Sequence, residues 1–260
     1  MNPIFMIWHH QHVLWATTVT DIRSRFIGTV FGAAWIIIYP LLFLGLYAVV
    51  YTMIYKVRVA HFGTFDYVLL IFCGLVPFLG FAEALGSGVG SVLGNKGLIK
   101  NTLFPIELIP VKAVLASSVT MLVGLLMLLC ILWYRGIVHS SQFLIPLILV
   151  LQIMFTIGLI WILSAINVFV ADLSQVVGVL ILFLMLVSPI AYTHEMIPSE
   201  LIPFMYPNPL YYLIMLYRDA AFVGDVKVEL LGIFTIISVA TLLLGGFIFS
   251  RLKPLFSDHV

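Results

Sequence analysis

The sequence predicts an all-α membrane protein with six transmembrane helices, because its composition and its charge spacing both match a chain surrounded by lipid. Hydrophobic residues make up 63% of the 260 residues and charged residues only 9%, whereas a soluble domain has about 25% charged residues. Four stretches contain no Asp, Glu, Lys or Arg: 35–55, 140–171, 173–194 and 230–250. A bilayer core about 30 Å thick needs about 20 apolar residues of helix. A soluble protein with an apolar core is excluded, since these segments lack a polar face.

The first element expected is a helix over residues 8–27 that lies in the membrane surface. Its apolar residues can face lipid while its polar residues meet water or headgroups, which is the pattern of an interfacial helix. A disordered tail is the alternative. The apolar set is Trp8, Val13, Leu14, Trp15 and Ile22, and the polar set is His9, His10, Gln11, His12, Asp21, Arg23 and Arg25.

Six apolar segments follow and predict a single transmembrane domain over residues 1–260. Pro40 interrupts the first segment and Pro77 the second, which a membrane helix tolerates where neighbours satisfy the freed carbonyl. The expected spans are 31–55, 66–87, 109–133, 142–170, 174–193 and 229–250.

Two regions between the spans are neither ordinary loops nor spans. Residues 90–104 are polar and charged, and we expect a short surface helix and turn over 91–104. Residues 194–218 combine several prolines with many aromatic residues. They are too broken to span and too apolar for a loop, so we expect short helices that dip into the membrane where protein covers the backbone.

The distribution of basic residues predicts that both termini are cytoplasmic. An even number of spans puts the two termini on one side, and cytoplasmic loops carry an excess of Lys and Arg. The N-terminal side carries seven such residues against five on the other side. The seven are Arg23, Arg25, Lys96, Lys100, Lys112, Arg251 and Lys253, and the five are Lys56, Arg58, Arg135, Arg218 and Lys227.

The chain lacks the residues that would let it drive transport or catalysis by itself. A phosphate-binding loop needs Gly-x-x-x-x-Gly-Lys-Ser/Thr after a strand, and the nearest approach, 90–96, has the wrong spacing. We therefore expect no cofactor in this chain. His9, His10 and His12 lack the spacing of metal ligands, which disfavours a metal site. No nucleophile accompanies His194, so we expect no catalytic site there. No cluster of basic residues indicates binding of nucleic acid.

Few ionisable residues fall near the centres of the spans, which disfavours an ion-coupled carrier. Glu83 is the main exception, with two interpretations: a pore-lining or gating carboxylate, or an interfacial residue hydrogen-bonded to a neighbouring helix or to a headgroup. For Arg218 and Asp219 the favoured interpretation is a structural ion pair at the outer surface.

Three stretches together resemble the permease subunits of type-2 ABC exporters for capsular polysaccharide and O-antigen. Residues 21–40 contain an Arg-x-Arg, a Gly-x-x-x-Gly, a Trp and a Tyr-Pro pair where many relatives have Asn-Pro. Residues 95–105 are similar to the family's Leu-Ile-x-x-x-x-Phe-Pro segment. Residues 188–192, 206–211 and 217–218 resemble its outer region before the last span. Each motif alone is weak, but their order covers nearly the whole chain.

The resemblance implies a homodimer in the bacterial inner membrane with two separate ATPase subunits that bind ATP and Mg²⁺. It implies a lipid-linked polysaccharide as substrate, a pore between the protomers, and contacts with periplasmic and outer-membrane export proteins. It also implies that 90–104 couples to the ATPase and that 189–218 forms re-entrant helices at a periplasmic gate. The coupling residues it indicates are Asn95, Lys96, Leu98, Ile99, Lys100, Phe104 and Pro105.

Aromatic rings can stack on the apolar faces of sugars, so aromatic residues are the candidates for lining a polymer path, although in membrane helices most of them pack or face lipid. Arg23 and Arg25 are candidates for binding phosphate on a lipid anchor or ordinary anionic headgroups. The pore candidates are Phe26, Phe31, Trp35, Tyr39, Phe78, Phe81, Tyr192 and Tyr211, and the gating candidates are Glu83, Pro189, Pro207, Pro209 and Arg218.

Three other functions remain open from the sequence. The first is a type-2 ABC permease for teichoic acid or a small drug. The second is an ion-coupled secondary carrier. The third is a membrane-embedded transferase, which the lack of an acid/base or metal cluster disfavours.

Overall fold

The computed structural model describes residues 3–50, 53, 63–97, 105–192, 200 and 202–258, and these residues form helices and connecting turns with no strand among them. The N-terminal helices are α1 (Pro3–His9) and α2 (Gln11–Phe26). A short 3₁₀ turn, η1 (Gly32–Ala34), leads into α3 (Trp35–Val49). The long helices are α4 (Thr64–Val89), α7 (Leu108–Tyr134), α8 (Ile145–Phe169) and α12 (Val228–Leu252).

Shorter helices connect the long ones. α5 (Ser91–Gly94) follows α4 directly. The turn η3 (Ser140–Leu144) precedes α8, and α9 (Leu173–Val187) follows it. Next come α10 (Ile202–Met205), α11 (Pro209–Arg218) and a π-helical turn, η5 (Asp219–Val223). The chain ends in η6 (Lys253–Asp258).

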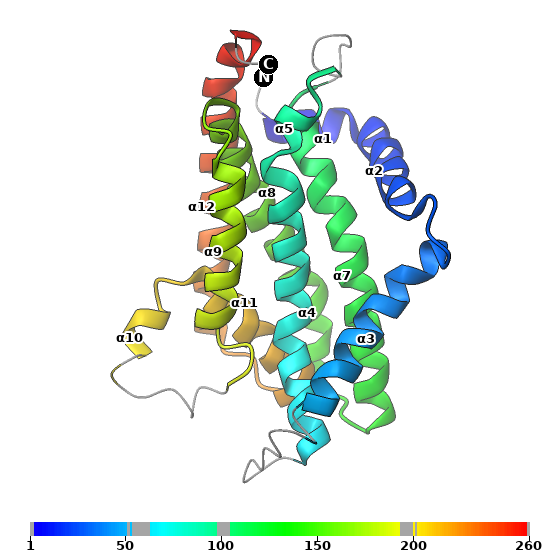
Figure 1. The fold of residues 1–260 in the computed structure, drawn as a ribbon. Helices are drawn as coiled ribbons and strands as arrows, with labels where there is room; N and C mark the ends of the chain where they lie inside the picture. The colour runs from blue at the N-terminus through cyan, green and yellow to red at the C-terminus, as the bar shows by residue number, and fades with distance from the viewer. Residues whose placement is uncertain are drawn as a thin grey trace.

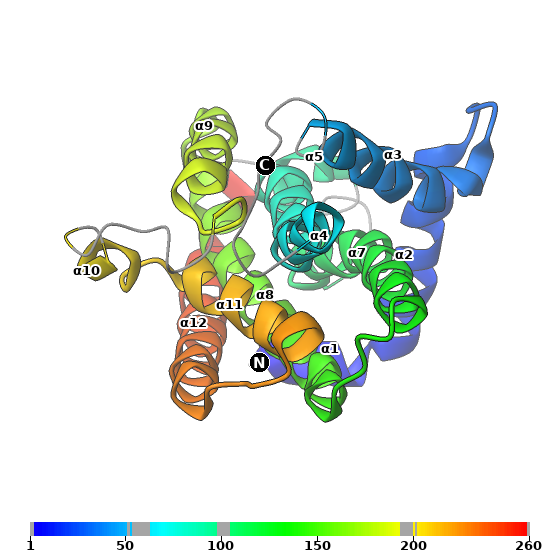
Figure 2. The same ribbon diagram turned by 90° about the horizontal axis from the view of Figure 1, so that it is seen from below.

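The bundle is built around α4. Figure 2 shows α4 surrounded by α3, α7, α8, α9 and α11. In the apolar window of α4, 83% of the residues are buried, against 11% for the window that contains α3 and 22% for that of α12. The apolar side chains of α3 and α12 therefore face outward, where lipid or another protein can cover them.

Helices α8 and α12 make the closest helix–helix contact, and two glycines allow it. A side chain at Gly158 would collide with the backbone of Thr241, and one at Gly245 would collide with the backbone of Gly158. Small residues at a crossing point let two membrane helices approach closely enough for extensive van der Waals contact. The α8–α12 pair is thus a rigid part of the bundle.

The first and last helices, α1 and η6, lie at the same end of the bundle, together with α5 (Figure 1). We call this the terminal end, and the opposite end, which carries α10 and α11, the distal end. The helix α9 runs between them, beginning near the terminal end after α8 and leading to the distal segment that contains α10 and α11 (Figure 1).

Helices begin and end within a few residues of the predicted bounds 66–87, 109–133, 142–170 and 229–250. The end of the predicted span 31–55 lies outside the described residues, and the count of six spans stays a prediction. Five helical segments are long and apolar enough to cross a membrane: Gly32–Val49, Phe65–Val89, Leu108–Tyr134, Ser140–Phe169 and Val228–Phe256. The helix in the predicted span 174–193 ends at Val187, because Ser188 takes an extended conformation, and its 15 residues fall short of that length. The predicted helix 8–27 is interrupted at His10 and forms α1 and α2.

Candidate functional site

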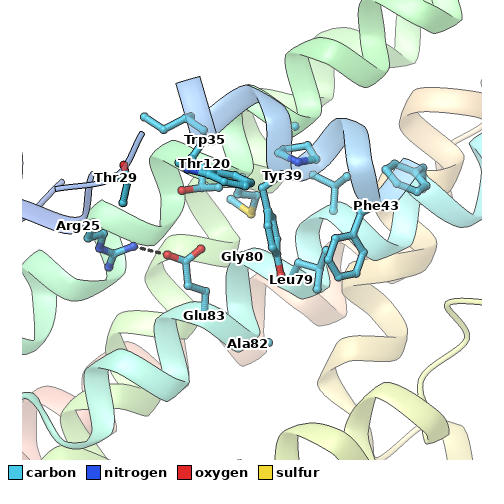
Figure 3. Close-up of a pocket in the computed structure, with 16 residues that line it drawn as sticks. Arg25, Thr29, Trp35, Tyr39, Phe43, Leu79, Gly80, Ala82, Glu83 and Thr120 are labelled. Atoms are coloured by element: carbon cyan, nitrogen blue, oxygen red, sulfur yellow. Dashed lines mark hydrogen bonds and ion pairs between the residues drawn. The ribbon is translucent and has the colours of Figure 1, made fainter. Parts of the chain in front are cut away.

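A pocket of about 660 Å³ lies between α3, α4 and α7, beside the end of α2 (Figure 3). Its walls are mostly apolar, and the side of α3 that faces it carries most of its aromatic lining. Arg25, Thr29, Glu83 and Thr120 are polar residues of its lining, and Arg25 and Glu83 face each other at one side (Figure 3). The pocket therefore offers apolar and aromatic surface along its length and charge at one side.

An aromatic ladder runs along α3 because aromatic residues recur at every fourth position: Phe31, Trp35, Tyr39, Phe43 and Tyr47. Residues four apart share a helix face. The ring centroids are 5.6 Å apart for Phe31 and Trp35, 4.9 Å for Tyr39 and Phe43, and 6.3 Å for Phe43 and Tyr47. Figure 3 shows Trp35, Tyr39 and Phe43 beside the pocket under α3.

The structure brings three predicted pore residues into this ladder and adds two that sequence reasoning missed. Phe43 and Tyr47 continue the series that Phe31, Trp35 and Tyr39 begin, and Tyr47 also packs edge-on against Phe72 of α4, with ring centroids 6.1 Å apart. The recurrence of aromatic residues at every fourth position of the sequence could have identified Phe43 and Tyr47 as members of the ladder.

The remaining predicted pore residues lie elsewhere. Phe78, Phe81 and Tyr211 are buried inside the bundle, at most 3% exposed, and Phe81 stacks on Phe155 of α8. The hydroxyl of Tyr192 donates to the carbonyl of Val187 at the distal end. Phe26 ends α2, and its side chain is outside the part of the chain that the structure describes. For these residues a role in lining the path stays a prediction.

The charged side of the pocket is formed by an ion pair between Arg25, near the end of α2, and Glu83 of α4 (Figure 3). A second ion pair joins Asp21 of α2 to Lys112 of α7, with 3.4 Å between nitrogen and oxygen. Together the two pairs hold α2 against the bundle. Glu83 thus bonds to a neighbouring helix, as one of its two interpretations expected. It also lines the pocket, and a gating role for it stays a prediction.

Arg23 is exposed, and its contact with headgroups stays a prediction.

At the distal end, Arg218 is buried and binds backbone carbonyls instead of Asp219. Its guanidinium donates to Ile190 at 2.6 Å, to Tyr192 at 2.9 Å and to Leu70 of α4 at 3.3 Å. The predicted ion pair with Asp219 is wrong, because residues adjacent on a helix point about 100° apart and Arg218 faces α4. One oxygen of the Asp219 carboxylate is buried without a hydrogen-bond partner.

Two of the predicted gating prolines lie next to helix ends: Pro189 follows the end of α9, and Pro209 begins α11. Pro189 is buried, directly after Ser188, and Pro207 is exposed. Pro209 is the first residue of α11, a position that needs no backbone N–H. Asn208 caps this helix: its side chain accepts from the amide of Leu210 at 3.0 Å and donates to Ser188 at 3.1 Å. The gating role of these prolines is untested.

Of the predicted coupling residues, the structure describes Asn95, Lys96 and Pro105, at the terminal end. Asn95 follows α5 and donates to the carbonyl of Ser91 at 2.7 Å, and Lys96 is exposed. Pro105 leads into α7 and is half-buried. The residues outside the described part are Leu98, Ile99, Lys100 and Phe104.

Among the described residues, no group of three or more His, Cys, Asp or Glu is placed to hold a metal ion. The chemistry available in the pocket is stacking, apolar contact and one ion pair.

Comparison with known proteins places this fold among transport proteins. The model of the ABC-2 type transporter family matches residues 12–222. The chain is 30% identical over 243 residues to an O-antigen export system permease protein RfbA of Klebsiella pneumoniae, covering 93% of this chain and 92% of that protein. It is 27% identical over 235 residues to the polysialic acid transport protein KpsM of Escherichia coli, covering 86% and 88% respectively.

Proposed function

The chain belongs to the ABC-2 type transporter family, and from this premise we propose that it is the permease subunit of an exporter that moves a lipid-linked polysaccharide across the bacterial inner membrane. Relatives that match over most of their length are named for export of O-antigen and transport of polysialic acid. Both are polysaccharides, which favours a polymer of sugars over teichoic acid or a small drug. Membership of the family argues against an ion-coupled carrier or a transferase.

The observation that carries the substrate class is the aromatic ladder on α3. Aromatic rings present apolar faces that contact sugar rings without fixed hydrogen bonds, so a chain can slide from one ring to the next. At a rise of 1.5 Å per residue, the ladder covers about 18 Å along α3 from Trp35 to Tyr47, and Phe31 extends it beyond the start of that helix. A series of this length suits a long, repetitive substrate better than a small molecule.

The path of the chain supports six crossings with both termini in the cytoplasm. The first and last helices share the terminal end (Figure 1), so the number of crossings is even. The five long spans become six when α9 is included. Its 15 residues cover about 22 Å, and residues 188–192, whose carbonyls at Ile190 and Tyr192 accept from Arg218, extend it at the distal end. Lys96 and Arg251 lie toward the terminal end, in agreement with positive residues on the cytoplasmic side.

Two copies of the chain enclose the path, and separate ATPase subunits drive it. The helix α3 exposes apolar side chains such as Ile37 and Leu42, with exposed fractions of 54% and 59%, which a second copy can cover. No ATP site occurs in the sequence. Asn95 and Lys96 follow α5 at the proposed cytoplasmic end, where the predicted coupling segment can dock on an ATPase and transmit its motion.

The experiment is to replace two rings of the ladder and measure polymer at the cell surface. We expect the Trp35→Ala, Tyr39→Ala double variant, produced together with its ATPase, to lower export about tenfold or more, because each lost ring removes about 1 kcal/mol of aromatic contact. The control is Ile236→Ala with Leu243→Ala on α12, two apolar residues that are 70% and 55% exposed and lie outside α3. Equal export by the ladder variant and the wild type, at equal amounts in the membrane, would remove the ladder from the path.

A further inference from the structure

A buried amide in the middle of the membrane bundle joins three helices. The side chain of Gln152 on α8 is 2% exposed. Its nitrogen donates to the carbonyl of Pro77 on α4 at 2.8 Å, and its oxygen accepts from the hydroxyl of Tyr217 on α11 at 2.9 Å. Tyr217 is itself fully buried. An unpaired amide is costly in hydrocarbon, so both bonds favour this one arrangement of the three helices.

The carbonyl that Gln152 holds belongs to the residue where α4 can bend. Pro77 has no N–H, so the carbonyl of Cys73 loses its helical partner, and sharp bends in long helices occur mainly at such prolines. Pro77 lies inside the continuous helix Thr64–Val89. It divides α4 into a distal half, before Pro77, and a terminal half.

The helix α11 is fastened to the distal half of α4. Arg218 donates to the carbonyl of Leu70, and a side chain at Gly74 would collide with Ile214 of α11. Arg218 also holds the carbonyls of Ile190 and Tyr192. The contacts at Leu70 and Gly74 both lie before Pro77, so a bend at Pro77 would leave them intact.

The helix that carries Gln152, α8, is held in place because it packs closely against α12 at Gly158 and Gly245. The pocket, in contrast, spans the bend: Val76 lines it from one side of Pro77, and Leu79 and Gly80 line it from the other. A bend at Pro77 would therefore change the shape of the pocket.

We propose that Gln152 is a positioning residue for transport. It anchors a pivot at Pro77, about which α11 and the distal half of α4 move as one unit and reshape the aromatic pocket. This inference rests on the proposed function, because the movement has a purpose only if a polymer passes through the protein. Gln152 itself touches no polymer; it acts through Pro77 and Tyr217.

The first test separates the pivot from simple loss of folded protein by measuring polymer exported per ATP hydrolysed. Loss of folded transporter lowers both quantities together and leaves their ratio unchanged. In the transporter assembled with its ATPase, we expect Tyr217→Phe and Gln152→Leu to lower the ratio about three- to tenfold, as for loss of one buried hydrogen bond. The matched control is Tyr212→Phe, which removes a hydroxyl of the same helix that donates only to the nearby carbonyl of Tyr206 at 2.9 Å.

An unchanged ratio in Tyr217→Phe overturns the proposal. An equal fall in Tyr212→Phe also overturns it, since any hydroxyl of α11 would then have the same effect.

The second test measures the bend directly, with spin labels at Val223 after α11 and at Leu243 on α12, which are 51% and 55% exposed. A control pair, Val223 with Phe65 near the start of α4, lies within the proposed unit. Cys73 and Cys130 are replaced by alanine in this background. For Val223 and Leu243 we expect a narrow distance distribution in the wild type and an about twofold broader one in Tyr217→Phe, because the restraint at the bend is lost. The distribution for Val223 and Phe65 should stay narrow in both proteins. Equal widths for Val223 and Leu243 in the two proteins overturn the proposal.

The two tests distinguish failure of this inference from failure of the proposed function. A wild-type transporter that moves no polysaccharide would refute the proposed function, while the label distances would still decide whether α11 and the distal half of α4 form one unit.

Discussion

Individual polar residues in this chain are placed so that other groups of the protein replace water. Arg218 is buried beside three carbonyls, and Gln152 uses both ends of its amide. Asp219 differs, since one oxygen of its carboxylate has no hydrogen-bond partner. Burial raises the pKa of its carboxyl to about 6, while Lys227 lowers it, Asp225 raises it and Arg218 lowers it.

The raised pKa of Asp219 gives a prediction for stability against pH. An aspartate in an unfolded chain has a pKa near 3.9, so the folded protein holds the proton more tightly. The contribution of this group to stability is present below about pH 4 and is lost as the pH rises through about 6. We expect Asp219→Asn to be more stable than the wild type at pH 7.5, by about 1–3 kcal/mol, and to lose this advantage near pH 4.

The measurement is thermal unfolding in detergent at both pH values. The control is Glu229→Gln, which removes the same charge from an exposed position nearby. An Asp219→Asn variant with no advantage at pH 7.5 would contradict the assignment.

At the scale of elements, helix contacts depend on where small residues fall. The helices α8 and α12 meet at Gly158 and Gly245, where any side chain would collide with backbone. The helix α4 shows a second use of glycine: a side chain at Gly80 would meet Met121 of α7, and one at Gly88 would meet Ile160 of α8. Close helix packing thus replaces the hydrophobic effect, which lipid does not supply between membrane helices.

The α8–α12 contact predicts a large effect from a single methyl group. We expect Gly158→Ala to destabilise the protein by about 1–3 kcal/mol or more, because the backbones must separate to admit the new carbon. The matched variant is Gly232→Ala on α12, where a side chain would meet nothing within 4 Å. Melting temperatures of the two purified variants make the comparison, and a similar loss in both would show that the crossing is not tightly packed.

At the scale of the whole molecule, the chain is a multi-span membrane protein of the ABC-2 type transporter family, and its two ends carry different helices. The terminal end gathers the first and last helices with α5, and the distal end gathers α10 and α11 (Figure 1). In the proposed orientation, the terminal end faces the ATPase and the distal end faces the periplasm.

Labelling of single cysteines with a membrane-impermeant reagent tests this orientation. Tyr134, 92% exposed, ends α7 at the distal end, and Leu255, 50% exposed, lies in η6 at the terminal end. In a background without Cys73 and Cys130, we expect Tyr134→Cys to react in cells with a permeable outer membrane. Leu255→Cys should react only after the inner membrane is opened. The reverse pattern would invert the proposed orientation.

The sequence by itself determined that this is a helical membrane protein, roughly where its helices lie, and which family it resembles. These properties depend on local content: a run of apolar residues favours a helix in lipid whatever its neighbours are. The turn that divides α1 from α2 at His10 was not predicted, since no Gly or Pro marks it in the sequence.

Only the tertiary structure decided which side chains meet. An aromatic residue in a helix that is apolar on every side has no sequence signal for the face it occupies, so Phe78 and Phe81 turned inward while Phe43 and Tyr47 joined the ladder. The contacts that position the site join residues far apart in the chain. Arg25 reaches Glu83 over 58 residues, and Gln152 reaches Tyr217 over 65. Such contacts exist only after the helices have packed.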